Sequence, residues 1–228
     1  MEMTNAGHQE DDGVGGVMGE EVTTSAVLLG EPLPIELMNT VSVDGGRTRD
    51  ALADDTDAAD WLRAVSGRLE AETGIRPGPL DAEGIRTVAR SLRALRDALR
   101  RLASETTGDP RSSPASVPKP DRQKAISTLN ALARAWPELR WPADGPISRV
   151  YRGGRGEAQL AVQVIARQAV ELLTGPDRDH LRPCLAPNCL LFFADSHARR
   201  EWCSPVCGNR ARVARHYRRH HTSGVPLR

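Results

Sequence analysis

The four cysteines of this chain constrain its fold most, because all of them lie within 24 of its 228 residues. They are Cys184, Cys189, Cys203 and Cys207, in the spacing C-x4-C-x13-C-x3-C. Zinc prefers four sulfur ligands in a tetrahedron, and two close pairs separated by a loop supply that arrangement. A segment of this size cannot bury a sufficient core unaided, so a bound metal would supply the missing stability. The spacing therefore predicts one structural zinc ion held by these four residues.

Other uses of the cysteines agree less well with the sequence. The N-terminus is acidic rather than basic and then apolar, so we expect no signal peptide, a cytoplasmic protein and reduced thiols. A redox dithiol would need a C-x-x-C motif, which the sequence does not contain. A catalytic zinc keeps one coordination position open, whereas four cysteines close the site. His197, His216 and His220 are alternative ligands if one cysteine does not bind.

An arginine-rich helix is predicted after the last cysteine. We expect Gly208 to relax the backbone beside the metal and Asn209 to cap a turn, with helical spacing from Arg210 onward. Residues 196–228 contain eight arginines and a single acid. The planar guanidinium group binds phosphate and guanine through two hydrogen bonds at once. The predicted DNA contacts are Arg210, Arg212, Arg215, Arg218 and Arg219.

The segment between the two cysteine pairs is apolar. Residues 190–193 (LLFF) include both phenylalanines of the chain, so we expect a small strand in a miniature core around the metal. Val213 and Tyr217 are four residues apart and share one face of the predicted helix. We expect that face to pack on the strand.

Charge is distributed unevenly along the chain, although the net formal charge is only +1. Residues 1–60 carry 14 acidic and 2 basic side chains, and residues 61–177 carry 13 acidic and 19 basic ones. Residues 178–228 carry ten arginines against three acids. Such asymmetry indicates an anionic partner for the basic end. Double-stranded DNA is the predicted partner, with RNA, an acidic protein or the chain's own acidic N-terminus as alternatives.

The composition divides the chain into four regions. Residues 1–25 are acidic and free of aromatic side chains, so we expect a disordered lead-in. Residues 26–176 are predicted to form a helical domain with a small β-hairpin, residues 177–221 a zinc finger, and residues 222–228 a tail. No run of about 18 apolar residues exists, so we expect no membrane association. The fold class is therefore mainly α, with a treble-clef-like zinc knuckle that ends in the arginine-rich helix.

The first half of the helical domain contains three predicted elements. Pro32 and Pro34 interrupt the apolar segment 26–43, which we expect to be extended with a short helical turn. A helix is expected to begin at a cap formed by Thr56 or Asp57. Its buried face should carry Trp61 or Leu62, Val65 and Leu69.

The third element is the strongest periodic segment of the chain, and Asp81 is expected to cap it. Its apolar residues alternate three- and four-residue steps and are Ile85, Val88, Leu92, Leu95, Leu99 and Leu102. Arginines are expected to fill the opposite face. The pattern extends over fewer than about three heptads, so we interpret it as a core helix rather than a dimerising coiled coil.

The spacing of the apolar residues changes after the proline-rich loop 108–120. One helix is expected to carry Ile126, Leu129, Leu132 and Trp136 on one side. Asp144-Gly145 between two short β segments predicts a hairpin. We interpret residues 152–155 (RGGR) as a connector rather than a phosphate cradle, and residues 157–173 as a largely buried helix.

Two segments carry a family resemblance. Residues 202–213 (WCSPVCGNRARV) resemble the CGNR zinc-finger family, named for the tetrapeptide at residues 207–210. Upstream, residues 33–41 (LPIELMNTV), followed by an acidic turn and a Trp-Leu pair, are similar to the opening of the ABATE or stress-induced transcription regulator domain. The resemblance covers about residues 28–221. It implies a bacterial transcriptional regulator with a zinc-binding, DNA-binding C-terminus, and the four cysteines as zinc ligands.

The resemblance also draws attention to the knuckle between Cys203 and Cys207. Its three intervening residues, Ser204-Pro205-Val206, are one fewer than in many members of the CGNR family.

Spacing, charge and resemblance together predict a nucleoid-associated, DNA-binding transcriptional regulator that is not an enzyme. The alternative is a zinc-dependent interaction module whose basic helix docks on an acidic protein. Catalysis ranks third: Asp54, Asp55 and Asp57 near Asn39-Thr40 form a loose carboxylate cluster, but acids ahead of a helix more often cap it. We expect a homodimer if DNA binding is specific, because a protein that reads DNA as a monomer binds weakly. Whether a small-molecule effector binds the N-terminal domain stays open.

Overall fold

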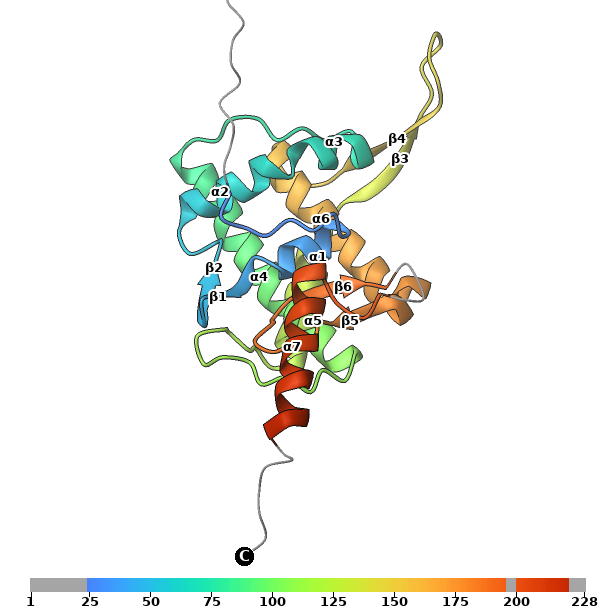
Figure 1. Cartoon of the computed structure of the whole chain (residues 1–228). Helices are drawn as coiled ribbons and strands as arrows, with labels where there is room; N and C mark the ends of the chain where they lie inside the picture. Colours follow the sequence, from blue (N-terminus) through green and yellow to red (C-terminus); the bar gives the residue numbers. More distant parts are fainter. Residues whose placement is uncertain (1–23, 196–199, 222–228) are drawn as a thin grey trace, which may run out of the picture.

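The computed structural model describes residues 24–195 and 200–221 (Figure 1). Nearly all of the predicted lead-in and the whole predicted tail lie outside these residues. The elements in chain order are α1 (Leu33–Met38), β1 (Val41–Asp44), β2 (Arg47–Asp50), α2 (Asp55–Ala64), α3 (Ser66–Thr73), α4 (Ala82–Thr106), α5 (Arg122–Leu132), β3 (Trp136–Arg140), β4 (Ser148–Arg152), α6 (Glu157–Thr174), the 3-10 helix η1 (Pro176–His180), β5 (Leu181–Pro183), β6 (Phe192–Ala194) and α7 (Pro205–His221).

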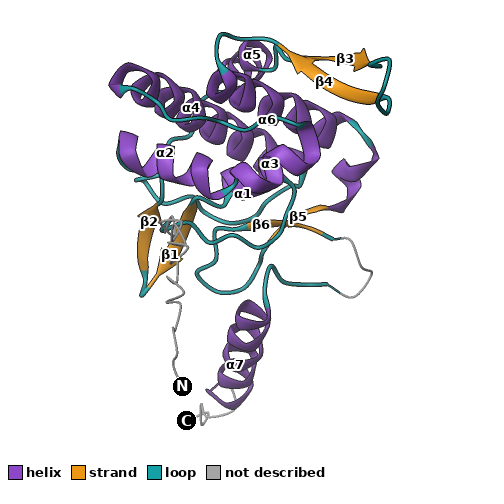
Figure 2. Cartoon of the chain, turned by 90° about the horizontal axis from the view of Figure 1, so that it is seen from above, coloured by secondary structure: helices purple, strands orange, loops and turns teal. Residues whose placement is uncertain are grey.

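Helices make up about half of the fold, and this confirms the predicted mainly α class. The strands of the described residues form only antiparallel pairs: β1 with β2, β3 with β4, and β5 with β6. In Figures 1 and 2, α7 and the β3–β4 hairpin extend from opposite sides of the helical body. Among the described helices, none combines the length and the apolar content needed to cross a lipid bilayer.

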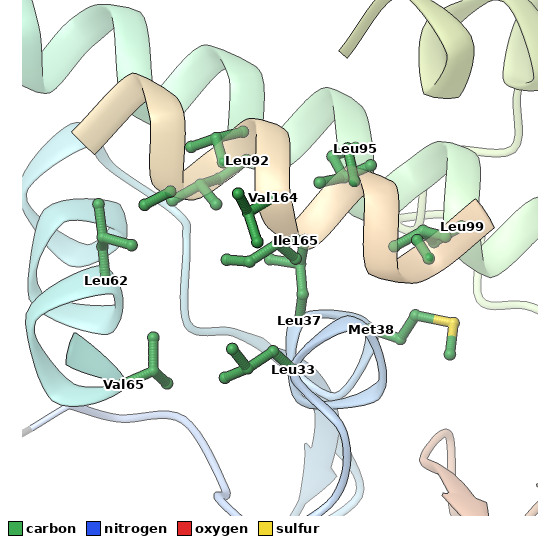
Figure 3. Packing of buried hydrophobic residues seen from close by; sticks show 14 of the residues in the cluster. Leu33, Leu37, Met38, Leu62, Val65, Leu92, Leu95, Leu99, Val164 and Ile165 are labelled. Carbon is green, nitrogen blue, oxygen red and sulfur yellow. The ribbon is translucent and has the colours of Figure 1, made fainter. Parts of the chain in front are cut away.

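α4 lies at the centre of the main hydrophobic core. Its fully covered side chains include Val88, Leu92, Leu95 and Leu99. They belong to one buried cluster with Leu37 of α1 and with Val164 and Ile165 of α6 (Figure 3). Burying a Leu, Val or Ile side chain contributes about 1.5–3 kcal/mol, so this cluster dominates the stability of the helical body. The prediction of a core helix is confirmed for these residues of α4 and for Leu102, which packs against the cluster, whereas Ile85 is not part of it.

Side-chain caps fix where the long helices begin. Asp54, rather than the predicted Thr56 or Asp57, is the N-cap of α2. Its carboxylate accepts a hydrogen bond from the Asp57 amide (2.8 Å), and the Asp57 carboxylate accepts one from the Asp54 amide (3.4 Å). This reciprocal box satisfies two backbone donors that the helix leaves unpaired. Asp81 caps α4 as predicted, accepting from the Gly84 amide at 2.8 Å.

Two arginines of α4 are buried, so the expectation that its arginines fill the solvent face is wrong for them. Arg96 Nη1 lies 2.5 Å from Asp50 Oδ1, and its Nε lies 3.0 Å from Asp97 Oδ1. Arg100 Nη1 donates to the Met38 carbonyl at 2.7 Å. Burial lowers the pKa of Arg100 to about 10. These side chains are tolerated inside because carboxylates and carbonyls satisfy their donors.

The predicted hairpin is present but begins earlier than expected. α5 ends at Leu132, and Trp136, which the periodicity places on that helix, instead opens β3 and is more than half exposed. The register pairs Trp136 with Arg152 and Arg140 with Ser148. Residues 141–147 form the tip and include the predicted Asp-Gly turn.

The RGGR loop fastens the base of the hairpin to α6. The Gly154 amide donates to Gln163 Oε1 at 2.7 Å. A Cβ atom on Gly153 would lie only 2.3 Å from the same oxygen, so a larger residue there would displace the Gln163 side chain from this contact. The close contact fixes the direction in which the hairpin leaves the body.

The C-terminal segment is packed directly on the helical body. Leu181 of β5 and Phe192 of β6 belong to the same buried cluster as α1, α4 and α6. Phe193 belongs to a second cluster, which also contains Cys184, Ala186, Cys189, Leu191, Cys203, Cys207 and Ala211. Successive residues of a strand face opposite sides, so β6 contributes one phenylalanine to each core.

Candidate metal centre

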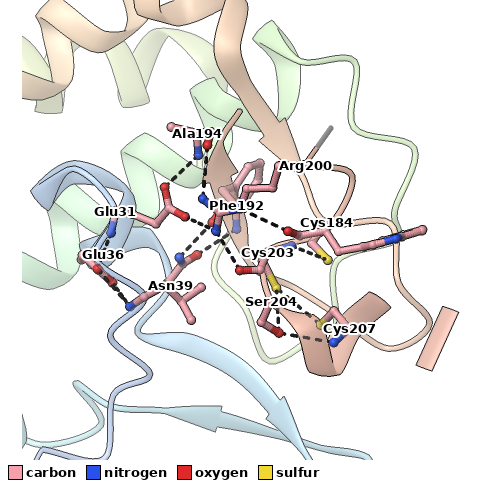
Figure 4. A network of polar contacts seen from close by, with 12 residues as sticks. Glu31, Glu36, Asn39, Cys184, Phe192, Ala194, Arg200, Cys203, Ser204 and Cys207 are labelled. Atoms are coloured by element: carbon pink, nitrogen blue, oxygen red, sulfur yellow. Dashed lines mark hydrogen bonds and ion pairs between the residues drawn. The ribbon is translucent and has the colours of Figure 1, made fainter. Parts of the chain in front are cut away.

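The structure brings the four cysteines into one buried cluster. Figure 4 labels three of them, Cys184, Cys203 and Cys207. Their Sγ atoms all lie within 4.8 Å of one another. The Cys203 Sγ is 3.4 Å from the Cys207 Sγ and 3.8 Å from the Cys189 Sγ, and none of the four residues is in a disulfide. Sulfurs about 2.3 Å from a zinc ion lie about 3.8 Å apart at the corners of a tetrahedron. The donor set therefore fits one tetrahedral zinc ion.

The first cysteine pair lies on a tight turn between β5 and β6. The Cys184 amide donates to the Leu191 carbonyl at 2.9 Å, and the Cys189 amide donates to the Ala186 carbonyl at 3.1 Å. Asn188 adopts a left-handed conformation with φ of 57°, which asparagine tolerates better than most residues. These local contacts close the turn and bring its two sulfurs together.

The second cysteine pair spans the start of α7, which begins at Pro205, earlier than the predicted start at Arg210. Proline suits this position because the first helical amide has no partner within the helix. The Ser204 hydroxyl precedes it and accepts a hydrogen bond from the Cys207 amide at 3.3 Å. Because the pair encloses the first turn, the short three-residue spacing still brings the Cys203 and Cys207 sulfurs to 3.4 Å.

Crowding of the sulfurs shifts their pKa values. Hydrogen bonds with the thiols of Cys189 and Cys203 lower the pKa of Cys184 to about 2. The hydrogen bond with Cys184 raises the pKa of Cys189 to about 12 and also raises the pKa of Cys203. The protein groups alone thus favour one thiolate and oppose further ones. A bound divalent cation stabilises all four as thiolates.

Hydrogen-bond donors face the cluster from the start of α7 and from the residue before it. Arg210 Nη2 donates to the Cys207 Sγ at 3.0 Å, and the Cys203 amide lies 3.5 Å from the Cys184 Sγ. Four thiolates around Zn²⁺ carry a net charge of about −2, which such contacts offset. The structure therefore places Arg210, predicted as a DNA contact, against the metal ligands.

The remaining positions of the CGNR tetrapeptide also differ from expectation. Gly208 lies inside α7, and a Cβ atom there would lie 3.1 Å from Trp202 Cδ1. The glycine thus lets the indole pack against the cysteine cluster, instead of relaxing the backbone. Asn209 is an exposed residue within α7 rather than its cap, and no contact among the described residues explains its side chain.

Arg111 holds the first cysteine turn, although no sequence pattern marks it. Its Nη1 donates to the carbonyl oxygens of Cys184 (3.2 Å), Cys189 (3.2 Å) and Leu191 (2.9 Å). Asp109 orients the guanidinium by accepting from Nε at 2.8 Å and from Nη2 at 2.7 Å. Arg111 lies in the proline-rich loop, where no periodicity distinguishes a half-buried residue from a solvated one.

Asn39, at the end of α1, pairs with the backbone of β6 (Figure 4). Its Nδ2 donates to the Phe192 carbonyl at 2.9 Å, and its Oδ1 accepts from the Phe192 amide at 2.8 Å. The amide side chain thereby makes the two bonds that a neighbouring strand would make. Asn39 fastens α1 to the finger in this way, and sequence reasoning did not assign it this role.

Glu31 and Arg200 form a second connection between the N-terminal segment and the finger (Figure 4). Glu31 accepts from the Ala194 amide at 2.9 Å and forms an ion pair with Arg200 at 2.5 Å. Arg200 Nη2 in turn donates to the Cys203 carbonyl at 2.8 Å. Both cysteine pairs are therefore held by arginines that contact backbone carbonyls.

α7 is anchored at its start and leads away from the body (Figure 2). Ala211 is buried against the cysteines, whereas Val213 is 51% and Tyr217 62% exposed. The expectation that Val213 and Tyr217 pack on residues 190–193 is therefore wrong. The earlier start of α7 turns Ala211 toward that strand instead. The exposed arginines of the helix are Arg212, Arg215, Arg218 and Arg219.

The carboxylates considered for catalysis have structural partners. Asp54 and Asp57 form the capping box of α2. Asp55 accepts a hydrogen bond from Arg93 at 2.8 Å. These contacts account for all three acids as groups that fix the start of α2 against α4.

The histidines considered as alternative ligands do not join the cluster within the described residues. His216 is exposed on α7 and is not part of the cysteine group. His197 and the side chain of His220 lie outside the part of the chain that the structure describes.

Comparison with known protein families covers both halves of the chain. The ABATE family, described as "putative stress-induced transcription regulator", matches residues 31–176, more than half of the sequence. The chain belongs to the ABATE family. The CGNR zinc finger matches residues 180–220, directly after it. A search of curated proteins found no match. Both resemblances drawn from the sequence are confirmed, in the predicted order.

The match to the CGNR zinc finger identifies the cysteine cluster as a zinc site. The match spans all four cysteines, and their sulfurs have the proximity that one tetrahedral ion requires. This ABATE protein is therefore a zinc-binding member of a regulator family, with one structural zinc ion as predicted. The ion supplies stability to a finger whose own hydrophobic cluster is small.

Proposed function

We propose that this ABATE protein binds duplex DNA through α7 and thereby regulates transcription. The observation that carries the proposal is the projection of α7 from the zinc centre with exposed arginines (Figure 2). Arg212, Arg215 and Arg219 follow the spacing i, i+3 and i+7 and so share one face. Such a face neutralises phosphates and reaches the base edges of a groove.

The dimensions of α7 suit the major groove. Its 17 residues extend over about 25 Å at about 1.5 Å per residue. The major groove is about 12 Å wide and admits a single α-helix. The zinc centre fixes the first turn, so the helix enters as a rigid element whose backbone needs little ordering.

Arg210 has a different role in this proposal. Its contact with the Cys207 Sγ offsets the negative charge of the zinc–thiolate group. The DNA contacts are then the four exposed arginines of α7: Arg212, Arg215, Arg218 and Arg219.

Salt-dependent binding of the zinc-loaded full chain to duplex DNA, followed by fluorescence anisotropy, tests the proposal. R212A/R215A should weaken binding and reduce the slope of log K against log salt by up to about 2, because each phosphate contact contributes about 0.9. The matched control is R86A/R90A, which removes two exposed arginines from α4. The proposal fails if both variants weaken binding equally, or if neither does.

Exposure of Val213 and Tyr217 favours a second candidate function, docking of α7 on an acidic protein. Aromatic side chains beside arginines are typical of protein interfaces. In that case the unmodified chain binds no duplex DNA at any salt concentration, and V213A/Y217A abolishes capture of the protein partner. On the DNA proposal, V213A/Y217A leaves the salt slope unchanged. In either function we propose that the protein acts by binding rather than by catalysis; four sulfur ligands leave the zinc ion no open position for a substrate.

A further inference from the structure

The β3–β4 hairpin extends from the body (Figures 1 and 2). Its apolar side chains are exposed to solvent. Trp141 is 72% and Leu139 69% exposed, and Trp136 and Ile147 are also more than half exposed. Only the base is packed, where Tyr151 touches the main core. The proposed DNA contact does not use this surface, since α7 lies on the opposite side of the body.

A hairpin of this kind requires a partner. Two strands without a covering layer are marginally stable in water. Here all residues from 136 to 144 are exposed, and so are residues 146–149. Contiguous exposed apolar side chains on a charged protein mark interaction surfaces. Two of the chain's four tryptophans lie on this hairpin, and tryptophan is the residue most enriched among interface anchors.

A groove that suits the tip lies beside the base of the same hairpin. It is a cavity of about 570 Å³ between the loop before α4 and the first turns of α4 and α6. Its lining combines apolar Leu80 and Val88 with the acids Asp81, Glu83 and Glu157, and with one base, Arg155.

The hairpin is complementary to this groove in both polarity and charge. Arg140 and Arg149 flank the apolar tip, and Glu83 and Glu157 lie in the groove. We propose that the hairpin is an arm through which two copies of this chain bind each other. The tip of each arm occupies the α4–α6 groove of the other copy.

The position of the groove explains why the partner is a second copy. β4 ends at Arg152, and Arg155, three residues later, lines the groove. The groove therefore adjoins the base of the arm. The arm from Gly145 to Arg152 is about 23 Å long at roughly 3.3 Å per residue. Two such arms side by side in opposite directions bring each tip to the base of the other. This exchange closes on itself about a twofold axis.

The surface available is sufficient for a stable pair. A covered tryptophan buries about 150–250 Å², so the four apolar side chains of each arm, eight in the pair, remove on the order of 1,000 Å² from water. The surfaces that receive them lose a similar area. The sum falls in the range of about 1,200–2,000 Å² found for stable interfaces.

Sedimentation of the zinc-loaded full chain over a concentration series tests the arm. The unmodified chain should have twice its 24.8 kDa monomer mass. L139S/W141S should weaken the pair at least about 100-fold, because buried anchors dominate such interfaces. Both side chains are exposed in the single chain, so zinc content should not change, and the melting temperature should match that of the unmodified chain at concentrations where both are monomeric. The matched control is V27S/L28S, which removes two exposed apolar side chains elsewhere.

A charge exchange tests the groove. E83R/E157R and R140E/R149E should each be monomeric, and an equimolar mixture of the two should recover the pair. A monomeric unmodified chain, a dimeric L139S/W141S, or a mixture that does not recover would each overturn the proposal. The inference does not rest on DNA binding, so R212A/R215A should remain dimeric. A monomeric chain that still binds DNA would contradict the proposed dimer but not the proposed DNA contact.

Discussion

Arg111 contacts three carbonyl oxygens of the first cysteine turn from a loop that lies 73 to 80 residues away along the chain. A guanidinium carries five donors in one rigid plane, whereas an ammonium group is a compact point charge. Arg111 binds the three carbonyls through Nη1 while Nε and Nη2 bind Asp109, and the single nitrogen of lysine cannot make both sets of contacts.

Arg111→Lys is expected to lower the free energy of unfolding by about 2–4 kcal/mol, since hydrogen bonds from a charged donor contribute about 1.5–3 kcal/mol each. Zinc should also pass to a competing chelator at a lower chelator concentration. Urea unfolding and a competition assay with a zinc-sensitive dye measure the two effects. The control is Arg90→Lys, on the exposed face of α4. Equal effects of the two substitutions would show that Arg111 does not hold the turn.

At this scale the sequence predicts the cysteines but not the residues that hold them. Two close cysteine pairs separated by a loop match the tetrahedral geometry of a bound zinc ion, so the sequence alone indicates the site. Arg111, Asn39 and Glu31 bind backbone groups, which every residue possesses, so no pattern in the sequence identifies their partners.

α1 is a short helix whose buried carboxylate ties down the segment before it. Glu36 is fully buried and accepts from the amides of Leu29 (3.0 Å) and Glu31 (2.7 Å). Arg68 lies 3.3 Å from the same carboxylate. Burial raises the pKa of Glu36 above its ordinary value of 4.5, although these contacts oppose the shift. The segment that contains Glu31 is thus held in place by a buried carboxylate whose charged form is destabilised by burial.

Glu36→Gln is expected to flatten the pH dependence of stability. Since the pKa is raised on folding, the folded protein holds a proton that the unfolded chain releases as the pH rises above 4.5. The free energy of unfolding therefore falls between pH 4.5 and the raised pKa, and the variant lacks this fall. Urea unfolding across this range should show the wild type losing stability relative to the variant. Exposed Glu83→Gln is the control. A difference that grows with pH in favour of the wild type would mean that the contacts outweigh burial.

Elements are predictable where one pattern determines them. The apolar period of α4 suffices to place it in the core, and Asp81 suffices to start it. α7 shows the limit. A four-residue spacing assigns Val213 and Tyr217 to one face, but the start of the helix decides which face meets the cysteine core. That start depends on Ser204 and Pro205, whereas the sequence predicted helical spacing only from Arg210 onward.

At the scale of the whole molecule, β6 joins two of the hydrophobic clusters formed by the described residues. Phe192 belongs to the core of the helical body and Phe193 to the cluster around the cysteines. Arg100 adds a polar link, because its Nη2 donates to the Leu190 carbonyl at 3.2 Å. Loss of order in the finger should therefore reach the helices.

Removal of zinc with a chelator is expected to lower the melting temperature of the full chain by at least about 10 °C. Structural zinc contributes several kcal/mol, and each kcal/mol shifts the melting of a chain of this size by about 2–4 °C. Far-UV circular dichroism should show one transition in both states, and added Zn²⁺ but not Mg²⁺ should restore the original one. A separate, unshifted transition of the helices would show that the two cores unfold independently.

The two-sided β6 strand also limits how this protein can be recombined. A chimaera that grafts residues 180–220 onto a foreign scaffold would expose Phe192 and would lack the side-chain amide of Asn39 that completes the strand. Substitutions at either position need a compensating change at the other, so the two halves are constrained to diverge as a pair. The orientation of α7 is consequently inherited from the helical body and cannot be adjusted by lengthening a linker.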